Sequence, residues 1–281
     1  MRGPDPAAGI ARGHAKQLKV TVTPGWLRNH RTSRNLALLD ARSRGAYRRS
    51  HIPRAIHADL FHYFVPGTDK KGLQKFRAEL ALRLGRMGLT GKETVIVYES
   101  GFGMRAARVA WMLEYAGAHR VLLLEGGFQA WRRFHYPVEE RVANPDQKIF
   151  RVRPVSRLIA TADEVRSNRA GVVLDVRSEG EFVGKEGRDC DARLGRIPYA
   201  RWLEWTNFLH DGERFKTVQE MSRALKEKKL SRQKPVVTYC HRGARAAAAF
   251  YALRSLGYPN VKNYIGSWHE WSARRNLPVE R

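Results

Sequence analysis

The sequence contains two copies of one unit, and this repeat limits the folds that the chain can adopt. Four short blocks of the first half recur in the second half in the same order, with loops of slightly different length between them. The paired blocks are residues 38–43 and 173–178, 51–55 and 196–200, 95–99 and 236–240, and 126–131 and 266–271. The largest extra segment of the second copy lies around residues 184–194. We therefore expect two domains of the same fold in tandem.

Each copy alternates apolar runs with helical segments. Residues 121–124, 172–174 and 236–238 are mostly apolar, which is typical of strands buried on both faces. Residues 104–115 and 245–256 are typical of helices, and a glycine that can end a helix follows each of them. Strands that alternate with helices indicate α/β domains with parallel sheets.

The polar stretch that begins at residue 143 suggests a linker between the two copies. The expected organisation is a flexible extension at 1–19, a first domain at 20–142, a linker at 143–156 and a second domain at 157–281.

Charge and histidine spacing narrow the class of protein. The 281 residues carry a net charge of +25, from 52 Lys and Arg against 27 Asp and Glu. The basic residues are spread along the chain, which favours a solvated surface that attracts small anions over a nucleic-acid interface. No run approaches the ~18 apolar residues of a membrane span. The histidines lack a metal-binding spacing such as His-Glu-x-x-His, so neither a membrane partner nor a metal is expected.

The chain has only two cysteines, Cys190 and Cys240, which do not suggest a disulfide framework. A working thiol suits a reducing compartment. We expect a monomer in the cytoplasm, with the mitochondrial matrix as an alternative because the first residues are basic.

Cys240 lies where a strand should end and a helix should begin. The run 236–239 precedes it, and the alanine-rich segment 245–249 follows a short turn. Unpaired backbone N–H groups and the helix dipole at such a position favour the reactive thiolate. Arg242 and Arg245 add positive charge nearby. The alternative is a buried, inert cysteine, but these charged neighbours would be costly to bury.

These motifs resemble those of the tandem-domain rhodaneses, which are thiosulfate sulfurtransferases. The resemblance extends from about residue 20 to residue 280. It rests on the Asp-x-Arg strand ends, the His-Ile-Pro motif at 51–53, the stretches 195–205 and 264–271, and the Cys240 loop. It implies two tandem rhodanese-like domains, each a central parallel sheet flanked by helices. Glu99 occupies the place of Cys240 in the first copy, so the resemblance implies a catalytically silent first domain that covers one wall of the pocket.

The resemblance also implies the chemistry of Cys240. Its thiolate would take the outer sulfur of thiosulfate as a persulfide, release sulfite, and pass the sulfur to cyanide or a thiol, without a cofactor. The residues implied to bind the donor are His241, Arg242, Gly243, Ala244 and Arg245. Trp205 is expected either as an apolar wall of the pocket or in ordinary core packing. Only four residues separate Cys240 from Arg245, whereas cysteine phosphatases have five, and the shorter loop suits a single sulfur atom.

Three alternatives remain open on the sequence. The donor can be 3-mercaptopyruvate, although the basic loop after Cys240 favours thiosulfate. The chain can be a persulfide carrier for a protein partner, or a basic nucleic-acid-binding protein on a rhodanese scaffold. The sequence also departs from the family: Glu181 stands where animal members carry a substrate-binding arginine, and Arg196 replaces a histidine.

Several residues near the site have expected supporting roles. Asp175 and Arg177 should form a buried ion pair that fixes a loop. Glu99 should pair with Arg105 or Arg108. Cys190 lies in an acidic loop, so we expect an idle surface thiol, with a resolving cysteine as the alternative.

Overall fold

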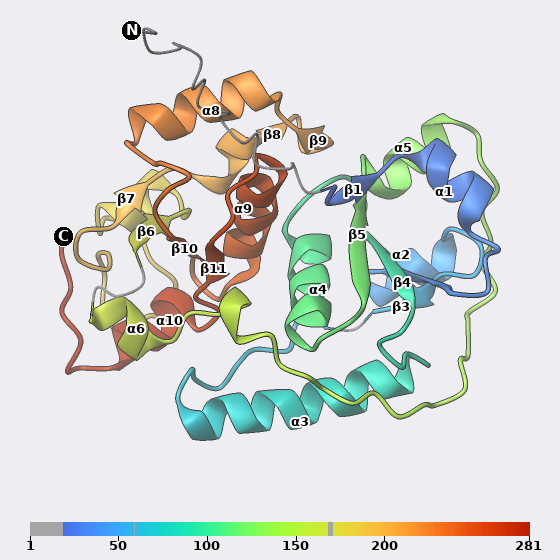
Figure 1. The fold of residues 1–281 in the computed structure, drawn as a ribbon, viewed down its shortest axis with the longest axis horizontal. Helices are drawn as coiled ribbons and strands as arrows, with labels where there is room; N and C mark the ends of the chain where they lie inside the picture. Colours follow the sequence, from blue (N-terminus) through green and yellow to red (C-terminus); the bar gives the residue numbers. More distant parts are fainter. Residues whose placement is uncertain (1–18, 59, 168–170) are drawn as a thin grey trace, which may run out of the picture.

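The computed structural model describes residues 19–58, 60–167 and 171–281. All but the last residue of the expected extension at 1–19 lie outside the described residues. The two halves of the chain form separate parallel sheets, which lie on opposite sides of a central pair of helices (Figure 1).

The first half forms a sheet with the strand order β1-β5-β4-β2-β3, and all its strand pairs are parallel. Its strands are β1 (Thr21–Val22), β2 (Leu36–Asp40), β3 (Ile56–His57), β4 (Thr94–Tyr98) and β5 (Arg120–Leu124). Its helices are α1 (Pro24–His30), α2 (Arg44–Arg49), α3 (Lys70–Arg86), α4 (Met104–Tyr115) and α5 (Gly127–Arg133). The central strand β4 is apolar and buried because helices cover both faces of the sheet.

The second half repeats this architecture with the strand order β11-β10-β6-β7, again parallel. Its strands are β6 (Val172–Asp175), β7 (Arg201–Trp202), β10 (Val236–Tyr239) and β11 (Val261–Asn263), beside a small antiparallel hairpin of β8 (Leu209–His210) and β9 (Arg214–Phe215). Its helices are η1 (Ser156–Leu158), α6 (Ala162–Arg166), α7 (Glu179–Phe182), η2 (Trp205–Phe208), α8 (Val218–Glu227), α9 (Ala244–Ser255) and α10 (Ser267–Ala273). The expected architecture, two α/β domains in tandem with central parallel sheets, is confirmed.

The repeat extends to individual side chains. Arg42 pairs with Asp40 at the end of β2, and Arg177 pairs with Asp175 at the end of β6, each at 2.6 Å. Both pairs are buried. The matching ion pairs explain why the Asp-x-Arg motif occurs in both copies.

Helices α4 and α9 pack against each other at the interface of the two domains (Figure 1). Alanines at 246–249 are buried and allow α9 to approach its neighbours closely. Glu114 of α4 accepts hydrogen bonds from Tyr251 and Arg254 of α9. One apolar core includes residues of both helices, so the interface is continuous with the domain interiors.

The segment 141–155 contains no helix or strand and crosses the first domain. The backbone N–H of Lys148 donates to the carbonyl of Gly85 in α3, and the backbone N–H of Arg153 donates to the carbonyl of Ala116 after α4. Among the described residues, no helix has the length and apolar character needed to cross a membrane.

Candidate active site

Cys240 directly follows β10 and lies four residues before α9 begins. Its side chain is buried, and the backbone N–H of Gly243 donates to its Sγ at 3.1 Å. Gly243 has a φ of 80°, and a Cβ at this position would lie 2.8 Å from the carbonyl oxygen of Ile265. Glycine is therefore required for the turn that directs this N–H group at the sulfur.

The loop that carries Cys240 is fixed by α10. The carbonyl of Cys240 accepts from the backbone N–H of Trp268, and that of His241 accepts from His269. The backbone N–H of Cys240 donates to the hydroxyl of Ser267. These bonds hold the thiol at the N-terminal end of the 12-residue helix α9, where the helix dipole favours negative charge.

The thiol lines a pocket of about 350 Å³ between the two domains. The lining residues are Phe61, Phe64, Met104 and Arg108 from the first domain, and Arg188, Cys190, Cys240, His241, Arg242, Ala244 and Arg245 from the second. The first domain thus forms one wall of the pocket. Apolar rings on one wall and several cations around the thiol suit a small anion that carries sulfur.

Arg108 lines the pocket, although the sequence did not identify it as a site residue. It belongs to α4 of the first domain, and its side chain is buried. It donates to the carbonyl of Arg242 at 2.7 Å and to that of Tyr63 at 2.8 Å. The expected pair with Glu99 is not formed by Arg108, because its side chain reaches the second domain instead. Burial lowers the pKa of Arg108 to about 10, so the guanidinium stays charged at neutral pH.

Arg245 and Glu181 form a two-bonded ion pair on the pocket wall, with N–O distances of 2.5 and 2.8 Å. Burial alone would raise the pKa of Glu181, but the hydrogen bonds and charge of Arg245 hold it at about 2. The carboxylate therefore offsets the charge of Arg245, which was expected to bind the donor. Glu181, which stands where animal members of the family carry an arginine, thus pairs with a cation of the pocket.

Arg242 belongs to the loop that carries Cys240, and its side chain lines the pocket. Its guanidinium lies over the ring of Phe64 at 4.5 Å, and its Nη2 lies 3.6 Å from Sγ of Cys190. Cys190 is exposed, yet it lines the same pocket as Cys240. Sγ of Cys190 also lies 3.6 Å from Nε2 of His241. The sequence could not predict this proximity, because the two residues are 51 positions apart in the chain.

The expected pair of Asp175 and Arg177 supports the loop and does not line the pocket. Arg177 also donates to the carbonyl of Gly195, and the hydroxyl of Tyr239, next to Cys240, donates to Asp175. The pair is buried and satisfied on both sides. The geometry is that of a support for the end of β10.

Trp205 lies at the start of η2, outside the pocket lining. It is partly buried against the main core, and a Cβ on Gly103 of the first domain would lie 3.8 Å from its ring. The structure thus places Trp205 at the domain interface, packed against the main core.

Glu99 takes the place of the thiol in the first domain. Its carboxylate accepts from the backbone N–H of Arg105. Burial raises the pKa of Glu99 to about 7, against the opposing effect of Arg105. With no thiol at this position, the first copy cannot hold a sulfur atom in this way.

Two segments, 23–134 and 161–274, match the family model of the rhodanese-like domain. A thiosulfate sulfurtransferase of Azotobacter vinelandii is 28% identical over 266 residues, which cover 94% of this chain and 97% of that protein. A 3-mercaptopyruvate sulfurtransferase of Escherichia coli (strain K12) is 28% identical over 273 residues, which cover 92% and 97%. A crystal structure described as a probable thiosulfate sulfurtransferase is similar at a TM-score of 0.72 and 32% identity, over 88% of this chain and 98% of that one.

Proposed function

Because the chain belongs to the rhodanese family, we propose that it is a thiosulfate sulfurtransferase that carries the transferred sulfur on Cys240. The observation that carries the proposal is the position of the thiol. Sγ of Cys240 lines the pocket, faces the N-terminal end of α9 and accepts the N–H of Gly243. The helix N-terminus and the N–H of Gly243 can both stabilise the negative charge that a persulfide on this sulfur would carry.

In the first half of the reaction, the Cys240 thiolate attacks the outer sulfur of thiosulfate. A sulfur–sulfur bond forms at Cys240 while that of thiosulfate breaks, and sulfite leaves with the electron pair. Arg242 holds the sulfite oxygens by charge-assisted hydrogen bonds, and His241 and Ala244 line the pocket around the donor. The N–H of Gly243 stabilises the charge at the persulfide.

In the second half, an acceptor removes the sulfur. Cyanide attacks the terminal sulfur, a carbon–sulfur bond forms, and the electrons of the broken sulfur–sulfur bond return to Cys240 as a thiolate. A thiol can serve as acceptor in the same way. A thiolate that must be regenerated in each cycle suits a reducing compartment such as the cytoplasm.

A second donor, 3-mercaptopyruvate, is favoured by one observation. Glu181 offsets the charge of Arg245, so the pocket carries less positive charge than the loop sequence suggests. A singly charged donor needs fewer cations than the doubly charged thiosulfate. The apolar wall of Phe61 and Phe64 would also suit its carbon chain.

Initial rates with each donor, against cyanide, distinguish the two. The proposal predicts a higher kcat/KM for thiosulfate, with ping-pong kinetics because the sulfur is held on the enzyme between substrates. A higher kcat/KM for 3-mercaptopyruvate would assign the chain to the second activity.

A further inference from the structure

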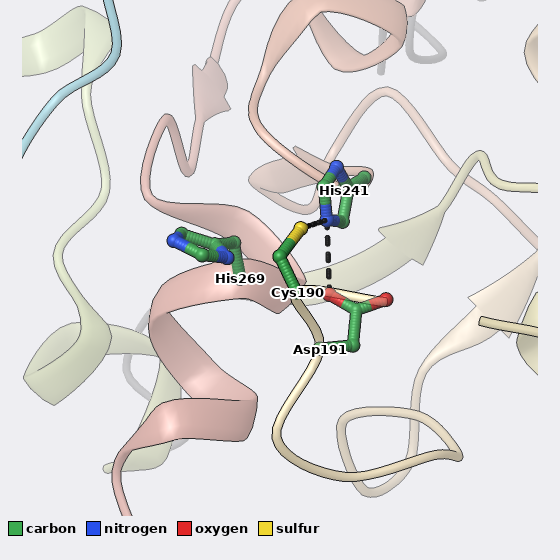
Figure 2. A group of neighbouring side chains, drawn as sticks. All are labelled: Cys190, Asp191, His241 and His269. Atoms are coloured by element: carbon green, nitrogen blue, oxygen red, sulfur yellow. Dashed lines mark hydrogen bonds and ion pairs between the residues drawn. The ribbon is translucent and has the colours of Figure 1, made fainter. Parts of the chain in front are cut away.

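Four side chains with metal-binding atoms converge on the rim of the active-site pocket. They are Cys190 and Asp191 from the loop of the extra segment, His241 from the Cys240 loop, and His269 from α10 (Figure 2). One ligand atom from each lies within 4.8 Å of every other. The spacing of these residues along the chain gave no sign of a metal, because three separate segments supply them.

We propose that Cys190, Asp191, His241 and His269 form a binding site for a divalent cation that prefers sulfur and nitrogen ligands, with Zn²⁺ as the best fit. The donor set is one thiolate, one carboxylate and two imidazoles, and each is an ordinary ligand of Zn²⁺. Magnesium and calcium prefer sites built from oxygen, and Cys190 does not suit them.

The distances are close to those of a tetrahedral site. Metal–ligand bonds of about 2.0–2.3 Å place neighbouring ligand atoms of a tetrahedron about 3.3–3.8 Å apart. Sγ of Cys190 lies 3.6 Å from Nε2 of His241, which lies 2.9 Å from Oδ1 of Asp191. The ring of His269 lies beside Cys190, and a ligand atom of His269 lies within 4.8 Å of those of the other three residues (Figure 2).

The geometry fits a metal better than a catalytic triad. In a triad, the two nitrogens of the histidine contact different partners, so that one holds the acid and the other serves the thiol. Here the same nitrogen, Nε2 of His241, faces both Cys190 and Asp191 (Figure 2). One proton on Nε2 cannot point at both atoms, whereas a cation placed among the three contacts them all.

Charge does not oppose the proposal. The thiolate of Cys190 and the carboxylate of Asp191 together neutralise a divalent cation. The side chain of Asp191 is only 1% exposed, so its carboxylate is already desolvated beside His241. The guanidinium of Arg242 lies 3.6 Å from Cys190 and 3.3 Å from His269. With a bound divalent cation, this guanidinium would face a metal complex without net charge. Its contact with the ring of Phe64 holds it at the edge of the proposed site.

Cobalt provides the direct test, because tetrahedral Co²⁺ absorbs visible light and a cobalt–thiolate bond adds a charge-transfer band. Titration of the whole chain with Co²⁺ should give one equivalent bound with both signatures, and Zn²⁺ should displace it. Cys190→Ser should abolish the charge-transfer band. His269→Gln and Asp191→Asn should weaken binding by about tenfold or more.

Two controls separate this site from other metal binding. Cys240→Ser should keep the band, because the catalytic thiol is not a ligand. His119→Gln changes an exposed histidine elsewhere and should bind as the unmodified chain does. A band that survives in Cys190→Ser, a band lost only in Cys240→Ser, or no binding of Co²⁺ and Zn²⁺ would each overturn the proposal. This test does not depend on which sulfur donor the protein uses.

Discussion

Arg245 of α9 donates two hydrogen bonds to the carboxylate of Glu181 of α7 on the pocket wall, although the two residues are 64 positions apart in the chain. The sequence suggests that Arg245 and Arg242 act together on the donor. The pair with Glu181 separates their roles, because Arg245 is already neutralised and Arg242 is not held by a carboxylate of the described residues. The two arginines should therefore respond differently to substitution.

Arg242→Ala should lower kcat/KM for thiosulfate by about 10- to 150-fold, which corresponds to the ~1.5–3 kcal/mol of a charge-assisted hydrogen bond. The loss should be smaller for a singly charged donor. Arg245→Ala should instead lower the free energy of unfolding, because it leaves the buried Glu181 without its partner. Steady-state kinetics and urea unfolding of both variants test this, and the same kinetic loss in both would show that Glu181 does not neutralise Arg245.

Glu99 should make stability depend on pH. Burial raises its pKa from 4.5 to about 7, so the folded protein binds this proton more tightly than the unfolded chain. The stability that the proton provides is complete below pH ~4.5 and is lost as the pH rises through about 7. Glu99→Gln should therefore become more stable than the unmodified protein at pH 8, by about 1–3 kcal/mol, but not at pH 4.5.

Urea unfolding at both pH values measures the effect of Glu99. The exposed Glu140→Gln is the control and should show no such change with pH. Parallel stability profiles for Glu99→Gln and the unmodified protein would mean that the folded state does not raise this pKa.

Arg108 should couple the domains to the active site. Arg108→Lys keeps the charge but cannot donate to the carbonyls of Arg242 and Tyr63 in the same fixed geometry. We expect a loss of about 1.5–3 kcal/mol in the free energy of unfolding, together with lower sulfur transfer. Arg105→Lys, on the same helix and over the ring of Phe61, should change both less. Thermal unfolding and initial rates would contradict this role if the two variants behaved alike.

The first domain should not become active when it is given a thiol. Helix α4 begins five residues after Glu99, whereas α9 begins four residues after Cys240, so the N–H groups of the longer loop should not converge on one sulfur atom. In a Cys240→Ser background, Glu99→Cys should transfer sulfur from thiosulfate at least ~100-fold more slowly than the unmodified protein. Rates close to those of the unmodified protein would show that loop length is unimportant.

The sequence predicted the features of the fold and the site that depend on residues close together along the chain. The strand end, the glycine turn and the alanine-rich helix place Cys240 correctly, and the Asp-x-Arg motif of the second copy predicts the buried pair of Asp175 and Arg177, because these features are set by neighbours along the chain. The repeat was enough to predict two parallel α/β domains.

The site residues that the sequence did not predict depend on packing between segments that are distant along the chain. Phe61, Phe64 and Arg108 reach the site only because α4 packs against α9. Cys190 looked idle because its neighbour His241 approaches it only in the folded chain. The sequence left Trp205 open between the pocket wall and the core, because an aromatic ring suits both, and its packing at the domain interface depends on the distant Gly103.

The central claim is that Cys240 carries the sulfur, and mass spectrometry of the intact chain and its peptides after treatment with thiosulfate tests it most directly. The account predicts one added sulfur atom, on the peptide that contains Cys240, and its loss when cyanide is added. Cys240→Ser should remain folded and gain no sulfur, because oxygen cannot form the persulfide. Sulfur found on Cys190 instead, or rapid transfer by Cys240→Ser, would contradict the account.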